Sequence, residues 1–174
     1  MSDTQDPAAA ERAWRKFAAA RFVMLVSSET DGMPYGCPMT VQHDDGGLLW
    51  MFTAAGTPSA QHIARDARVM VVVMDGDDSF YVAAKGRAQV SNDRERMKQL
   101  FNPMVKAWFP QGLDDPQLRL LRVELTQAEY WDSASSKLVR MASMAKALVS
   151  GERPHDIGAH GTLDPQRGHA AGVD

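Results

Sequence analysis

The sequence has few of the features that mark several classes of protein. It contains one cysteine, Cys37, so the chain cannot form an internal disulfide, and a metal site would need other ligands. Lysine and arginine total 19 against 22 aspartate and glutamate, which gives a net charge of -3. This balance lacks the basic surface with which proteins bind nucleic acid. We therefore expect neither a disulfide-stabilised scaffold nor a nucleic-acid-binding protein.

Long apolar runs are also absent. No stretch approaches the roughly 20 apolar residues that span a bilayer. Residues 1–17 are polar and acidic, unlike the basic and then apolar start of a signal peptide. We therefore expect a cytoplasmic protein that does not enter a membrane. With 174 residues and no internal repeat, the chain is expected to form one compact domain.

The first part of the chain shows one helical pattern followed by three strand patterns. Residues 8–21 carry Trp14 and Phe17 at helical spacing, which predicts an amphipathic helix ending near Arg21. Residues 22–53 contain three β-rich runs separated by "ETDGMP" and "DDGG", whose Gly and Asp residues suit reversing turns. An antiparallel meander is predicted.

Three further strands are predicted. A short helix over residues 59–67 leads into strands at 68–75 and 79–91, and a sixth strand is predicted at 118–132. Between the last two, residues 92–109 predict a pair of helices around Pro103, opened by an Asn92 cap with Glu95 at the capping-box position. Six strands without a repeated βαβ unit favour an antiparallel barrel with helices outside it.

The C-terminal part predicts a last helix and a tail. Residues 135–151 have helical spacing and end at Gly151, so we place one domain at 1–150. Residues 151–174 are rich in Gly, Pro and His with few large apolar side chains, which predicts a flexible tail. His155, His160 and His169 have no spacing typical of a closed metal site, so no metal is predicted.

Several stretches are similar to one known family. They are "GCPMTVQHDDGGLLWMFTAAGTPSAQHIARDARVMVVV", "FYVAAKGRAQV", "KAWFP", "EYWD" and "SSK". Together they resemble the general stress protein branch of the pyridoxamine 5'-phosphate oxidase-like, FMN-binding split-barrel family, from about Trp14 to Val149. The resemblance implies a mainly β fold with flanking helices, a six-stranded antiparallel split β-barrel. It also implies a homodimer with cofactor clefts at the interface and a small-molecule ligand.

The resemblance implies a set of cofactor-binding residues for FMN. The ring and ribityl chain would lie along the second and third strands, and the phosphate would lie at the loop after the third strand. Flavin needs a flat slot, hydrogen bonds to the ring edge, and donors or positive charge for its phosphate. The implied residues of these strands and this loop are Pro38, Met39, Thr40, Gln42, Met51, Phe52, Thr53, Thr57, Pro58 and Ser59.

Four more candidates lie further along the chain, where the family match continues. Tyr81 and Trp131 are candidates for the flavin edge, and Lys137 and Arg140 are candidates to reach the cleft from the partner subunit. The last two matter because the family commonly has basic residues where this chain has Cys37 and Ser59.

Structural interpretations of the same residues stay open. Thr53, Thr57 and Ser59 are also typical of a helix cap and a turn. Tyr81 and Trp131 are also typical core residues of strands.

Two functions are compatible with the sequence. The first is a flavin-dependent oxidoreductase of unknown substrate, in which the ring carries the redox chemistry. The second is a non-catalytic flavin or small-ligand binding protein, a carrier or sensor of the general stress type. FAD, the deazaflavin F420 and haem are the alternative cofactors. A true pyridoxamine 5'-phosphate oxidase is not expected, because "DSASSKLVRM" after Trp131 lacks the arginine and histidine pattern that grips its substrate.

Overall fold

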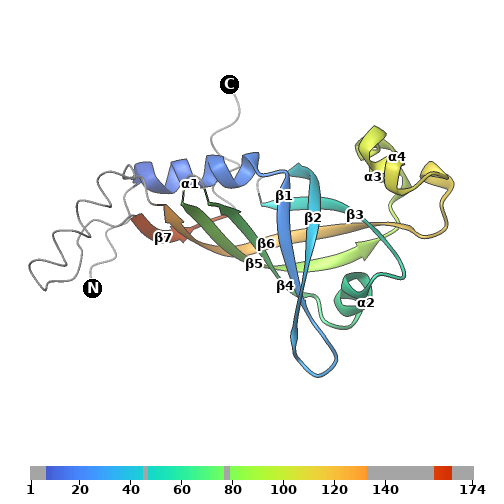
Figure 1. Cartoon of the computed structure of the whole chain (residues 1–174), viewed down its shortest axis with the longest axis horizontal. Coiled ribbons are helices and arrows are strands. Elements are labelled where there is room, and N and C mark those ends of the chain that lie inside the picture. The colour runs from blue at the N-terminus through green and yellow to red at the C-terminus, as the bar shows by residue number, and fades with distance from the viewer. Residues whose placement is uncertain (1–6, 45–46, 77–78, 133–158, 166–174) are drawn as a thin grey trace, which may run out of the picture.

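The computed structural model describes residues 7–44, 47–76, 79–132 and 159–165 of the chain. Within these ranges the fold is an antiparallel sheet with short helices around it (Figure 1). The strands are β1 (Phe22–Ser28), β2 (Pro34–Asp44), β3 (Leu48–Ala54), β4 (Arg68–Asp75), β5 (Phe80–Ser91), β6 (Leu118–Asp132) and β7 (Ala159–Leu163). The helices are α1 (Pro7–Ala19), α2 (Pro58–Arg65), α3 (Arg94–Leu100), α4 (Pro103–Trp108) and the 3-10 turn η1 (Gly112–Asp114).

The sheet closes on itself through its longest strand. Its order is β3-β2-β1-β4-β5-β6-β7, and β3 pairs in addition with β6. Residues 118–124 of β6 pair with β3, whereas residues 128–132 of β6 pair with β7. Six strands thus form the barrel, and β7 extends the sheet where β3 and β6 part. The predicted six-stranded antiparallel split barrel is confirmed.

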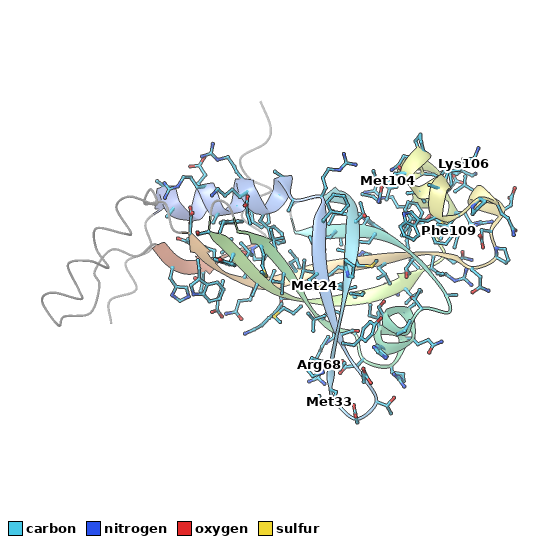
Figure 2. All side chains as sticks on the ribbon, in the orientation of Figure 1. Met24, Met33, Arg68, Met104, Lys106 and Phe109 are labelled. Atoms are coloured by element: carbon cyan, nitrogen blue, oxygen red, sulfur yellow. The ribbon has the colours of Figure 1, made fainter. Side chains whose placement is uncertain are left out.

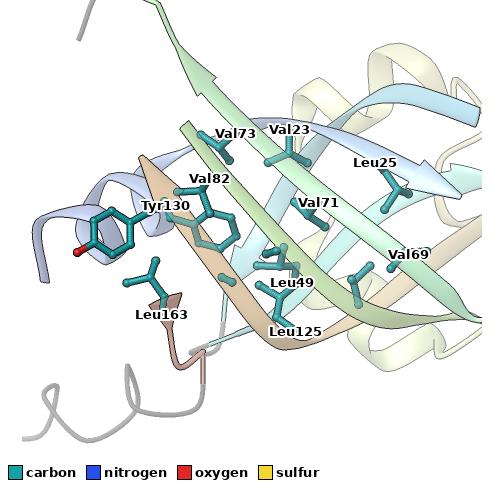
Figure 3. Close-up of a cluster of buried hydrophobic side chains, with 14 of the residues drawn as sticks. Val23, Leu25, Leu49, Val69, Val71, Val73, Val82, Leu125, Tyr130 and Leu163 are labelled. Atoms are coloured by element: carbon teal, nitrogen blue, oxygen red, sulfur yellow. The ribbon is translucent and has the colours of Figure 1, made fainter. Parts of the chain in front are cut away.

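The barrel interior is filled by alternate strand residues. In β1 and β4 every second side chain is buried, which is the period expected of a strand with one face in the core. Figure 3 shows aliphatic side chains of different strands meeting there, among them Leu25, Val71, Val82 and Leu125. Burial of one such side chain contributes roughly 1.5–3 kcal/mol, so this core dominates the stability of the fold.

Helix α1 covers one end of the barrel. Ala9, Ala13 and Phe17 are spaced by four residues, lie on one face of the helix and are buried in the barrel core. At the end of β6 the carboxylate of Asp132 is 2% exposed, and it lies 3.6 Å from both Arg12 Nε and Lys16 Nζ. The ion pairs therefore fix α1 over the sheet at the same place as the apolar contacts.

A second, smaller core lies on the outer side of β3 and β6. Trp50, Met97, Leu118 and Leu120 are buried there beneath α3 and α4. Asp93 caps α3, since its side chain accepts a hydrogen bond from the backbone N–H of Arg96 at 3.0 Å. The predicted Asn92 cap is therefore wrong by one residue. Phe101 and Phe109, which flank α4, pack against this core and so place the helix beside the barrel.

The other predicted elements have mixed outcomes. All six predicted strands are present, and the sixth has the predicted bounds. The flexible tail is wrong for residues 159–163, which form β7 against the part of β6 that β3 leaves unpaired, with Leu163 buried. The predicted helix at 135–151 lies outside the described residues, and the boundary at residue 150 stays a prediction. Of the helices in the described ranges, none combines the length and apolar character needed to cross a bilayer.

A bulge in β6, opposite Lys85 and Gly86 of β5, explains one glycine. The register between β5 and β6 shifts between Lys85 and Gly86. A Cβ atom on Gly86 would overlap the backbone carbonyl of Glu124 and lie 3.2 Å from the Cα of Leu125. Only glycine allows the two strands to approach this closely.

We therefore expect Gly86→Ala to lower the free energy of unfolding by about 1–3 kcal/mol, because backbone atoms must shift to admit the methyl group. Gly76→Ala is the matched control, since a Cβ at Gly76 has no atom within 4 Å, and its effect should stay within about 0.5 kcal/mol. Urea denaturation measures both. Equal stabilities of the two variants would contradict the close approach at Gly86.

Candidate functional site

A cleft of about 430 Å³ lies between the β2–β3 side of the barrel and α4. Figure 2 shows Met104 on the side of α4 that faces the barrel and Lys106 on the far side. The described residues that line the cleft are Pro38, Met39, Thr40, Gln42, Phe52, Thr53, Ala54, Thr57, Met104, Val105, Trp108 and Phe109. Seven of them are among the residues that the sequence predicted for the cofactor site.

One wall of the cleft comes from β2 and from the end of β3. Pro38 and Thr40 lie on the outer face of β2, because their partners in β1, Met24 and Phe22, are exposed. Gln42, two residues further, donates to the backbone carbonyl of Thr40 at 3.4 Å. This wall therefore presents amide and hydroxyl groups to a ligand.

The opposite wall comes from α4 and is apolar. Trp108 is 82% exposed and Met104 is 47% exposed, although both line the cleft. Phe109 follows the helix and packs against the second core. Large apolar side chains that stay accessible beside a cleft are available for contact with a flat ligand.

A hydrogen-bond chain fixes the distance between the two walls. Asn102 caps α4, since its Oδ1 accepts from the N–H groups of Met104 and Val105 at 3.0 and 3.1 Å. Its Nδ2 donates to Gln42 Oε1 at 2.7 Å. One side chain thus starts the helix of one wall and bonds to the strand of the other.

The loop after β3 is held by its own hydroxyl groups. Thr57 caps α2, accepting from the Ala60 N–H at 3.3 Å and donating to the Ala54 carbonyl at 2.9 Å. Because the Thr57 hydrogen is engaged there, the 2.9 Å contact between Thr53 and Thr57 makes Thr53 the donor. Both hydroxyl hydrogens therefore serve the loop, and both Thr57 lone pairs are used as well, so only the Thr53 oxygen can still accept a hydrogen bond.

Beneath α2 lies a group of buried polar side chains. Ser59 is 3% exposed and accepts from the Cys37 thiol at 3.4 Å. Ser27 Oγ lies 3.2 Å from His62 Nδ1, and the ring of Tyr35 meets the His62 ring edge-on at 5.2 Å. These contacts attach α2 to the inner faces of β1 and β2.

Several predicted site residues lie away from the cleft. Met51 is fully buried in the barrel core, and Ser59 lies on the buried face of α2. Pro58 is the first residue of α2 and is outside the cleft lining. Tyr81 and Trp131 are cross-strand partners on the outer face of the sheet, 38% and 41% exposed.

Trp131 is covered in part by β7. Its ring stacks on His160, with the centroids 5.1 Å apart and the planes 17° from parallel. Lys137 and Arg140 lie outside the described residues. The cofactor roles of all these residues stay predictions.

The electrostatics of the cleft are neutral. None of the described residues that line it carries a charged side chain.

At the C-terminal end of α2, Arg68 donates from its side chain and its backbone N–H to Asp66, which lowers the pKa of Asp66 to about 2. In the described ranges, no three His, Cys, Asp or Glu side chains come together as a possible metal site.

Sequence reasoning missed the α4 wall. Met104, Val105, Trp108 and Phe109 contact the cleft only after the second core has placed the helix. The signal was present in "KAWFP", where two aromatic residues follow a capped, proline-started turn. An exposed aromatic residue such as Trp108 in a short surface helix favours a binding role.

Comparison with known proteins agrees with this fold. A general stress FMN/FAD binding protein from Xanthomonas citri superposes with a TM-score of 0.64 and 29% identity, over 74% of this chain and 92% of that chain. A protein assigned to general stress protein 26 from Jannaschia sp. CCS1 gives 0.67 and 28%, over 88% and 96%. Protein bli-3 of Neurospora crassa is 22% identical over 143 residues, which covers 76% of this chain and 68% of that protein.

The fold is that of a split-barrel protein with a cleft outside the barrel. Residues 8–155 match the family described as pyridoxamine 5'-phosphate oxidase like, and the chain belongs to this family. The resemblance stated from the sequence is thereby confirmed.

Proposed function

We propose that this chain binds a flavin, with the isoalloxazine ring in the cleft. The observation that carries the proposal is the neutral cleft itself, with an apolar aromatic wall from α4 and an amide- and hydroxyl-bearing wall from β2. A flat, uncharged ring with polar edges suits these two walls. The similarity to an FMN/FAD binding protein supports the same ligand class.

FMN is the proposed form of the flavin. The cleft volume of about 430 Å³ lies toward the small end of the roughly 300–1,000 Å³ that ligand sites span. A mononucleotide fits such a volume better than the dinucleotide FAD.

The proposed activity is that of a flavin-dependent oxidoreductase. When bound, the flavin would supply the electron transfer, and Thr40 and Trp108 on the two walls of the cleft would hold it. The described lining residues include no carboxylate, histidine or lysine. Protons would therefore come from water or from the substrate.

The described lining residues include no carboxylate, histidine or lysine, and this also favours a second candidate, a flavin-binding protein without catalytic turnover. Reduction by a nicotinamide cofactor distinguishes the two candidates. A bound flavin that loses its visible absorbance on addition of NADH or NADPH supports the oxidoreductase, whereas an unchanged spectrum supports the binder.

We also propose a homodimer, on the basis of the outer sheet face. Cross-strand register places Met74 opposite Tyr81, Tyr81 opposite Trp131, and Trp131 opposite His160. Met74 is 71% exposed, and the row is continued by apolar residues on β1. Exposed apolar residues in a contiguous row are typical of a surface that another chain covers.

The neighbouring cross-strand row on the same sheet face reaches the cleft, because Pro38 lines it. Met24 pairs with Pro38 on one side and with Val72 of β4 on the other. A second copy covering this face would therefore border the cleft. In a two-fold arrangement each row meets the same row of its partner, which would bring Tyr81 and Trp131 of one copy toward the cleft of the other.

For the ring site, we expect Trp108→Ala to weaken flavin binding about three- to tenfold, because aromatic stacking contributes roughly 0.5–1.5 kcal/mol beyond area burial. Quenching of flavin fluorescence on titration measures the affinity. Met33→Ala is the control, because Met33 is also exposed but lies in the turn between β1 and β2 (Figure 2). If Trp108→Ala binds flavin as tightly as the unaltered protein, the ring does not lie against α4.

For the assembly, we expect Met74→Glu to shift the protein from dimer to monomer at micromolar concentration, because the carboxylate would be desolvated in the interface. Light scattering measures the mass in solution. Met33→Glu adds the same charge off the sheet face and should leave the dimer intact. A Met74→Glu dimer as stable as that of the control would place the interface elsewhere.

A further inference from the structure

The proposed flavin site lacks a partner for a phosphate at the place where the family resemblance puts it. A phosphate monoester is close to a dianion at neutral pH, and bound phosphates are usually met by cations or by free N–H and O–H donors. The hydroxyl hydrogens of Thr53 and Thr57 are engaged within the loop, and Ser59 is buried under α2. The loop by itself therefore offers little to a phosphate.

The barrel closure brings a cation to this loop. Arg119 of β6 is the cross-strand partner of Thr53 in β3, so the two side chains emerge on the same face of the sheet. Thr53 lines the cleft. The backbone N–H of Ala55 donates to the carbonyl of Gln117 at 2.8 Å, which ties the loop to the turn that precedes Arg119.

The Arg119 guanidinium is held close to the sheet. Its Nη1 donates to the carbonyls of Pro116 and Leu118 at 2.9 and 2.7 Å, and the residue is half-buried. A guanidinium carries five N–H donors, so Nε and Nη2 add further donors to those used on the two carbonyls. An arginine fixed in this way loses little side-chain freedom when it binds an anion.

Three other cationic side chains bond to other residues or point away from the barrel. Arg65 donates to the Thr30 hydroxyl, and Arg68 is paired with Asp66, both at the end of α2 away from its cap. Lys106 points away from the barrel on the far side of α4 (Figure 2).

We infer that Arg119 binds the phosphate group of the flavin nucleotide and thereby determines the preference for a phosphorylated flavin. This inference rests on the proposed flavin-binding function and names the residue that selects the ligand's form. Arg119 on β6 then supplies the positive charge that the loop lacks at Ser59.

The test compares ligands that differ in the phosphate alone. The unaltered protein should bind FMN at least about tenfold more tightly than riboflavin at low salt, since a charge-assisted hydrogen bond contributes roughly a factor of ten or more. Arg119→Gln should weaken FMN binding about tenfold and change riboflavin binding less than about twofold. Arg119→Lys, which keeps the charge but not the fork of donors, should retain part of the preference.

Arg122→Gln is the matched control, because it removes the same charge from the same strand but on the opposite face, where Arg122 pairs with Glu124 at 3.5 Å. It should leave both affinities unchanged. FAD is titrated in parallel, and a selective loss for FMN or for FAD on Arg119→Gln supports the inference and identifies the nucleotide. Thermal unfolding of each variant confirms that the fold is retained.

Three outcomes would overturn the inference. If Arg119→Gln weakens riboflavin and FMN equally, the residue acts on the ring or the fold. If the unaltered protein binds the two flavins equally, no phosphate site exists, although flavin binding itself stands. If the unaltered protein binds neither flavin, the proposed function fails together with the inference.

Discussion

The pairing of β3 with the first half of β6 is the constraint on which the rest of the structure depends. It turns an open sheet into a barrel, and it divides β6 into a part that closes the barrel and a part that β7 covers. The outer side of the paired part of the two strands carries the second core with Trp50 and Leu120. The loop after β3 is bonded to the turn before β6 by the same pairing.

The position of the cleft follows from this closure. Helix α4 lies on the second core, and Asn102 joins its first turn to Gln42 of β2. The cleft is therefore bounded by the barrel on one side and, on the other, by α4 beside the small core outside the barrel. Its lining carries no charged side chain among the described residues, which suits the proposed binding of an uncharged ring.

Much of the fold could be predicted from the sequence, because strand alternation and Gly–Asp turns are local signals. The bounds of β6 were predicted correctly for this reason. Strand β7 was missed because its five residues, "AHGTL", contain a single large apolar side chain and form a strand only where β6 offers an open edge. Tertiary pairing overrides such weak local preference.

The site was predicted less completely, for two physical reasons. Met51 lies on the core side of β3 and is fully buried, whereas Phe52 lines the cleft. The alternation itself assigns Met51 to the core with Leu49, as observed. The α4 wall and the pairing of Arg119 with Thr53 depend on contacts between distant parts of the chain, which spacing alone does not reveal.

The central claim is that the cleft holds a flavin. An absorbance spectrum of the freshly purified protein tests this most directly, followed by mass analysis of the small molecule that heat releases. The account predicts the two visible absorbance bands of an oxidised flavin and release of FMN. A colourless protein that also fails to develop these bands when FMN is added would contradict it.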